Sequence, residues 1–197
     1  MEDIRNKNLN LKINNTWVES IKPIRSMKKS PKKSNGLLYF THMALPFEVN
    51  GYCTRTHGLL TGLSNHNTNI YVHSRYGYPS DKKNLRNIIS TEVKKEYLID
   101  KIKYLFTNES QSGFNDVDEL SYISKASQKL YNEIYHSPPS IIQAASNHVN
   151  GAIAMNVAKF MKIPFIYEVR GLWHMSRVAR EPEFYHHPQY LAMDNAE

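Results

Sequence analysis

The stretch Ser140–Val169, SIIQAASNHVNGAIAMNVAKFMKIPFIYEV, places a helical segment between two short apolar runs. The runs at 140–145 and 163–169 have the length and the apolar continuity of buried strands. Residues 151–161, between them, are rich in small residues and have the length of a helix. A strand, a helix and a second strand in this order predict two parallel strands joined by a right-handed crossover.

The same alternation continues on both sides of this unit. Upstream we expect strands, helices and one hairpin, and downstream a final helix that begins at residue 189. The segments are a strand at 37–43, a helix at 54–63 with Thr54 as its N-cap, a strand at 69–73, a hairpin at 94–106 and an amphipathic helix at 116–135. This order predicts an α/β fold with a parallel sheet and helices on both faces.

Residues 1–35 hold most of the net charge of +7. They contain nine Lys and Arg against three acidic residues, a net +6, which leaves +1 for residues 36–197. We expect a basic flexible tail or linker at 1–35 that can associate with an anionic membrane surface. Trp17 is its one aromatic residue, too little stacking surface to favour a nucleic-acid partner. The folded domain is predicted at 36–197.

The cysteine count and the terminal sequence indicate the compartment. Cys53 is the single cysteine, which excludes an internal disulfide framework and fits a reducing cytosol. The first residues lack the apolar core of a secretory signal, and no apolar run approaches the ~20 residues that span a bilayer. We therefore expect a cytoplasmic protein, peripheral at the inner membrane face where the basic tail associates with lipid.

Ligands of open α/β sheets bind at the carboxyl ends of the strands, so the loops at 43–54, 74–79, 146–150 and 170–188 are the candidate site. In the first loop Gly51 precedes a helix, whose free N–H groups favour an anion; a plain tight turn is the alternative. The glycines do not follow the dinucleotide spacing G-x-G-x-x-G. His186 and His187 are adjacent, which is not metal-ligand spacing on a helix, and no metal is expected.

Glu168 and Arg170 stand two residues apart at the end of the last predicted strand. Alternation along a strand places both side chains on one side of it. The pair can orient a substrate at the carboxyl end of the strand, or it can be a structural ion pair, for which desolvation offsets much of the attraction. Both interpretations remain open at this point.

Three stretches together resemble a known family. They are GYCTRTHGL at 51–59, RYGYP at 75–79, and IPFIYEVRGLW at 163–173 followed by REP at 180–182. In order and spacing they resemble the N-terminal domain of family-4 retaining glycosyltransferases of the GT-B fold, over residues 36–197. The resemblance implies the N-terminal half of a GT-B fold, in which two Rossmann-like domains face each other across a cleft.

The resemblance also implies an activity. Such enzymes transfer a hexose from a nucleotide-sugar donor to a glycan or lipid-linked acceptor in bacterial surface-polysaccharide synthesis, without a cofactor or metal. The N-terminal domain mainly holds the acceptor, and a C-terminal domain of the same protein holds the donor. The chain is expected to be cut before that second domain and inactive alone. The alternative is a non-catalytic Rossmann-like binding or scaffold domain.

The resemblance implies roles for individual residues. Gly51 and Tyr52 are expected near the donor diphosphate. Arg170 occupies a position that is often histidine in relatives and is expected, with Glu168, to be catalytic by stabilising the leaving phosphate or orienting acceptor hydroxyls. Where many relatives read H-A-H-S, this chain has QAAS at 143–146. The remaining expected substrate-binding residues are Arg55, His57, Arg75, Asn147, His148, Trp173 and Arg177.

Overall fold

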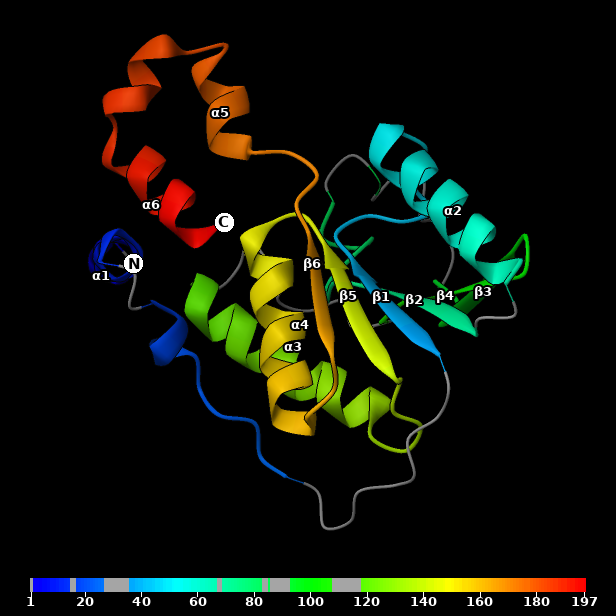
Figure 1. The fold of residues 1–197 in the computed structure, drawn as a ribbon. Coiled ribbons are helices and arrows are strands. Elements are labelled where there is room, and N and C mark those ends of the chain that lie inside the picture. Colours follow the sequence, from blue (N-terminus) through cyan, green and yellow to red (C-terminus); the bar gives the residue numbers. More distant parts are fainter. Residues whose placement is uncertain are drawn as a thin grey trace.

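The computed structural model describes residues 2–14, 17–26, 36–66, 69–82, 85, 93–107 and 118–197. Six strands form one sheet in the order β3-β4-β2-β1-β5-β6, parallel except for β3 (Figure 1). The strands are β1 (Leu37–Thr41), β2 (Ile70–Ser74), β3 (Glu96–Ile99), β4 (Ile102–Leu105), β5 (Ile141–Ala145) and β6 (Phe165–Glu168). The predicted α/β fold with a Rossmann-like parallel sheet is confirmed, and β3 and β4 form the predicted hairpin.

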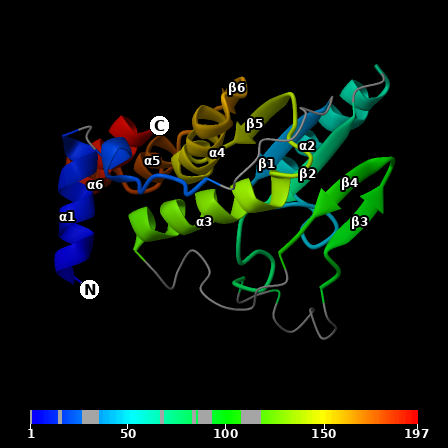
Figure 2. The same ribbon diagram turned by 90° about the horizontal axis from the view of Figure 1, so that it is seen from below.

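Both faces of the sheet are covered, because successive side chains of a strand point to opposite faces. Leu38 and Phe40 of β1 pack in one core with α3 (Glu119–Ile134) and α4 (His148–Met161). Leu37 and Tyr39 pack in a second core on the side of α2 (Gly51–Ser64). Figure 2 shows α3 and α4 together on one side of the sheet.

Two helices begin earlier than their apolar pattern predicts, since asparagine side chains cap them. The Asn50 side chain accepts a hydrogen bond of 3.0 Å from the Cys53 amide, so α2 starts at Gly51 and the prediction of Thr54 as N-cap is wrong. Asn147 caps α4 in the same way, so α4 begins at His148, three residues before the predicted start at Gly151. Gly151 lets α4 approach β6, because a Cβ there would lie 2.9 Å from the Tyr167 ring.

The segment after β6 is helical rather than the predicted loop at 170–188. It forms α5 (Trp173–Val178), the 3₁₀ helix η2 (Pro182–His186) and α6 (Pro188–Ala196). Near the start of the chain lie α1 (Glu2–Ile13) and the 3₁₀ helix η1 (Trp17–Ser20). The two ends of the chain lie side by side, with α1 against α6, in both views (Figures 1 and 2).

The prediction of a flexible tail at 1–35 is wrong for residues 2–14 and 17–26. Trp17 is 4% exposed and joins the core of α3 and α4, together with Ile24. The backbone N–H of Arg25 donates to Gln128 Oε1 at 2.7 Å, and Gln128 Nε2 donates back to the Arg25 carbonyl at 3.3 Å. The buried side chains of Trp17 and Ile24, together with these hydrogen bonds, thus hold the segment against α3. Residues 27–35 lie outside the described residues.

In the part of the chain that the structure describes, no helix combines the length and hydropathy needed to cross a bilayer.

Candidate functional site

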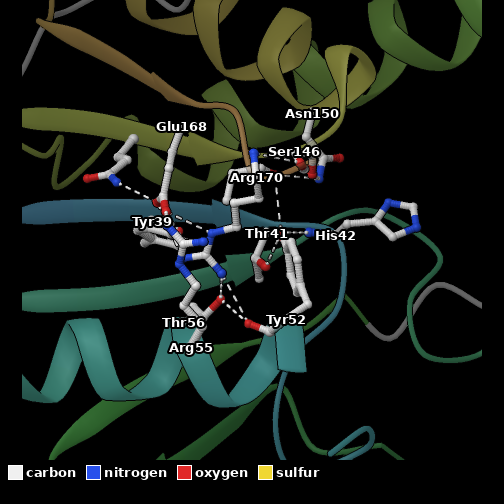
Figure 3. A network of polar contacts seen from close by, with 12 residues as sticks. Tyr39, Thr41, His42, Tyr52, Arg55, Thr56, Ser146, Asn150, Glu168 and Arg170 are labelled. Carbon is white, nitrogen blue, oxygen red and sulfur yellow. Dashed lines mark hydrogen bonds and ion pairs between the residues drawn. The ribbon is translucent and has the colours of Figure 1, made fainter. Parts of the chain in front are cut away.

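Arg170, just beyond β6, is at the centre of the polar network in Figure 3. Its Nε donates to Glu168 at 2.9 Å, and Nη1 donates to the Thr56 hydroxyl at 2.6 Å and the Tyr52 carbonyl at 3.1 Å. Nη2 donates to the Tyr39 hydroxyl at 2.7 Å and to Glu168 at 3.3 Å. All five N–H groups of the guanidinium thus have a protein acceptor. With 5% of its side chain exposed, Arg170 connects β6, β1 and the first turns of α2.

Glu168 is the acceptor on which this network converges. It accepts hydrogen bonds from the Tyr39 hydroxyl at 2.7 Å and from Gln143 at 3.0 Å, besides those from Arg170. Burial by itself would raise the pKa of the Glu168 carboxyl, but the hydrogen bonds from Arg170 and Tyr39 hold it below its usual value. Glu168 is therefore ionised at neutral pH, which fits an ion pair rather than a general acid.

Tyr52, in the first turn of α2, connects the ends of two strands. Its hydroxyl donates to the Ala145 carbonyl at 3.1 Å and accepts from the backbone N–H of His42 at 3.2 Å. The Thr41 hydroxyl lies 2.9 Å away. The Arg170 guanidinium lies over the Tyr52 ring, 5.0 Å from its centroid. These contacts fix the N-terminus of α2 above the carboxyl ends of β1 and β5.

Gly51, the first residue of α2, is exposed, and a Cβ there would meet nothing within 4 Å. Neither packing nor a positive φ requires glycine at this position. Glycine also lowers helix stability relative to alanine. The position thus has room for a ligand to approach the backbone, next to N–H groups that favour negative charge.

Arg75 follows β2 at the same edge of the sheet. Like that of Arg170, its charge is paired within the protein. Its guanidinium forms a two-pronged ion pair with Asp81, one of whose bonds measures 3.0 Å, and the side chain is 5% exposed. Burial and the charges of Arg75 and Lys82 lower the pKa of the neighbouring His42 to about 3. His42 is therefore a neutral imidazole at physiological pH, and its ring meets Trp173 edge to face at 5.8 Å.

Three of the expected substrate-binding side chains lie elsewhere. His57 is about 9 Å along α2 from Gly51 and contacts the Tyr104 hydroxyl at 2.8 Å and Asp100 at 3.0 Å. His148 contacts Lys12 at 3.0 Å and the Trp17 ring, on the side where the two ends of the chain meet. Arg177 pairs with Glu181 at 2.9 Å and stacks on Phe184. The structure does not bring these three side chains together with Arg170, and their role in binding a ligand stays a prediction.

The structure brings the other expected residues to one edge of the sheet. Exposed Arg55 (64% of its side chain) reaches Glu168 at 3.4 Å, and Asn147 is buried as the cap of α4. Further residues of the network were not singled out from the sequence: Tyr39, Thr41, His42, Thr56, Gln143 and Ser146. The run YFTH at 39–42 gave a signal, since polar residues end an otherwise apolar strand at the carboxyl edge.

Among the described residues, no three His, Cys, Asp or Glu side chains gather as a metal site would require.

The fold and this edge define an α/β domain of Rossmann-like architecture whose polar residues gather where the strands end. Comparison of the chain with protein-family models and with curated proteins gave no match. The sequence motifs and the geometry of the carboxyl edge are therefore the features of this chain that bear on its function.

Proposed function

We propose that this chain is the acceptor-side domain of a retaining glycosyltransferase of the GT-B type. In this proposal it acts with a second, donor-binding domain and transfers a hexose from a nucleotide sugar to a glycan or lipid-linked acceptor for bacterial surface polysaccharide. The reaction takes place in the cytoplasm, at or near the inner face of the membrane. It needs no metal and no cofactor besides the nucleotide-sugar substrate.

One observation carries the proposal: two of the stretches on which the family resemblance is based meet in space, and the third begins at the same edge of the sheet. Arg170 of YEVRGLW donates to Tyr52 and Thr56 of GYCTRTHGL, although more than 110 residues separate them. The backbone N–H of Arg75, from RYGYP, donates to the Thr41 carbonyl at 2.8 Å, at the end of β1. Motifs scattered along a sequence that converge at the ligand-binding edge of an α/β sheet are typical of one functional site.

The geometry supports distinct roles for these groups. Arg170 is a positioning residue, because its donors hold α2 against β6 and are engaged by protein acceptors. The N-terminus of α2, with exposed Gly51, is the element that a diphosphate from the facing domain can approach. The neutral His42 and the half-exposed Trp173 lie beside it. A neutral imidazole and an indole suit an uncharged acceptor better than a phosphate.

The test is turnover of nucleotide sugars by the protein of the complete reading frame. Purified enzyme is incubated with each common nucleotide sugar, and release of the nucleoside diphosphate is followed with and without an extract of bacterial glycolipids and glycans. We expect release with one donor, stimulated by acceptor. A well-folded protein that is inert towards every donor would remove this proposal.

A non-catalytic binding or scaffold domain is the second candidate, and the saturated guanidinium of Arg170 favours it. Because every N–H of that group is engaged within the protein, Arg170 offers no donor to a leaving phosphate in this arrangement. Binding of nucleotide sugar or acceptor without turnover by the complete protein would select this candidate.

A further inference from the structure

An exposed apolar segment lies directly after the network of Arg170. Twelve large apolar side chains are exposed in the described part of the chain, and five of them fall between Ile166 and Met175. Four lie beyond β6, and we call them the apolar segment: Val169, Leu172, Trp173 and Met175, which are 43–49% exposed. Single exposed apolar residues are common on proteins, but such a concentration marks an interaction surface.

The position of the segment places it beside the proposed site. Val169 comes directly before Arg170, and Leu172 comes directly before α5, which contains Trp173 and Met175. Trp173 contacts His42, the residue that follows β1. Gly171, between Arg170 and Leu172, has open space where a side chain would be. A ligand that contacts His42 therefore lies next to Trp173.

The charges around the segment favour an uncharged occupant. The Arg170 guanidinium is engaged in the network, and Arg177 is paired with Glu181 while its guanidinium lies 3.9 Å from the centroid of the Phe184 ring. Arg180 is exposed and donates to the Ser176 carbonyl at 3.3 Å, and Glu181 and Glu183 follow it. From residue 168 to residue 183 three arginines thus balance three glutamates. A surface without net charge has no electrostatic preference for an anionic lipid headgroup or a polyphosphate, whereas four apolar side chains bury hydrocarbon favourably at ~25 cal/mol per Å².

We propose that the apolar segment holds the hydrocarbon part of a lipid-linked acceptor, with its saccharide towards His42. The inference rests on the proposed function and narrows it, because it selects a lipid-linked acceptor over a free glycan. Trp173 stands between the two parts of such a ligand, and its indole suits both, since one surface is apolar and the N–H is a donor.

The test uses methyl, hexyl and octyl β-D-glucopyranosides below their micelle concentrations, with tryptophan fluorescence as the readout. Trp17 is 4% exposed and Trp173 43% exposed, so a blue shift on titration reports burial of Trp173. We expect saturable one-to-one binding whose affinity rises about fourfold for each methylene that becomes buried. Trp173→Ala should weaken the binding of the octyl glucoside, followed by calorimetry, at least tenfold.

Leu98→Ala is the matched control, because Leu98 is 70% exposed on β3, at the opposite side of the sheet. Binding that Leu98→Ala leaves unchanged and Trp173→Ala removes supports the proposal. Equal affinity for all three glucosides assigns the surface to a free glycan and overturns it. Absence of binding by all three, or equal loss in both variants, also overturns it.

This test is independent of turnover. If the complete enzyme used a free glycan as well as a lipid-linked one, the proposed function would stand and this inference would fall. If it turned over no donor while octyl glucoside still bound at Trp173, the apolar site would stand without the proposed function.

Discussion

The Arg170 guanidinium lies 2.7 Å from the Tyr39 hydroxyl, and that hydroxyl in turn lies 2.7 Å from Glu168. Tyr39 is fully buried in β1, so a charged pair at the end of β6 is joined across β5 to the centre of the sheet. The position of Arg170, and with it that of the α2 N-terminus, is thus set by the core of the domain. A substitution at Arg170 therefore affects folding as well as the groups at this edge.

Arg170→Ala should lower the free energy of unfolding by about 3–5 kcal/mol, because it leaves Glu168 and buried hydroxyls without their partner. Arg55→Ala removes a guanidinium that is 64% exposed and contacts the same carboxylate, and should change stability by less than about 0.5 kcal/mol. Urea unfolding of both variants measures the difference. Equal stabilities for Arg170→Ala and the wild type would make Arg170 a residue held for a ligand instead.

Gly51→Ala should separate ligand binding from folding. A methyl group at Gly51 meets no atom within 4 Å, so thermal stability should stay unchanged or rise slightly, whereas a ligand that approaches the backbone loses contact. Gly58→Ala is the matched control, on the same helix, equally exposed and equally open. We expect nucleotide-sugar turnover by the complete enzyme to fall at least tenfold for Gly51→Ala and to stay unchanged for Gly58→Ala. Similar turnover in both would show that no ligand approaches Gly51.

The regular elements of the sheet could be predicted from the sequence because their signals are local. The apolar runs at 37–43 and 140–145, and the stripe of Ile123, Leu130 and Ile134, give the period and the buried face directly. By contrast, the segment at 2–26 is mostly polar and basic, and its contacts with α3, α4 and α6 form only in the tertiary structure. Such contacts leave no periodic pattern in the sequence.

The candidate site could be predicted only in part, for a similar reason. The two-residue spacing of Glu168 and Arg170 predicted that both side chains lie on the same side of the strand. The protein acceptors for all five N–H groups of Arg170 depend on how α2 packs against β6. The sequence does not show that packing. That His57 and His148 lie away from Arg170 could not be predicted, because proximity to a helix start says little about the direction of a side chain, which packing decides.

Acidification should weaken the contact of α1 with α3 and α4 through Glu119. Burial alone would raise the pKa of this carboxyl, but His148 and Lys12 lower it from 4.5 to about 2. A carboxyl whose pKa is lower in the folded state contributes stability above pH 4.5, and this contribution is lost as the pH falls towards 2. Glu119→Gln should therefore flatten the dependence of the unfolding midpoint on pH between 5 and 2.5. Glu96→Gln, at a half-exposed ion pair with Lys103, should leave that dependence as it is.

Cys53 should be unreactive in the native protein. Burial, and secondarily the charge of Glu48, raises the pKa of its thiol to about 11, and the side chain is 1% exposed. Because the thiolate is the reactive form, a thiol reagent at pH 8 should label almost none of the native chain and one group per chain in urea. Labelling of the native chain at the rate of a free thiol would show that the first turn of α2 opens readily.

Trp17→Ala should show whether the N-terminal segment is an integral part of the domain. Trp17 is 4% exposed in the core of α3 and α4, so its truncation should cost about 3–5 kcal/mol. Val18→Ala, at the next residue, removes a side chain that is 39% exposed and should cost less than about 1 kcal/mol. Urea unfolding gives both values, and proteolysis gives a second readout, because loss of the Trp17 contact should expose residues 2–26 to cleavage while residues 36–197 persist. If Trp17→Ala were as stable and as resistant as Val18→Ala, this segment would be an appendage rather than part of the core.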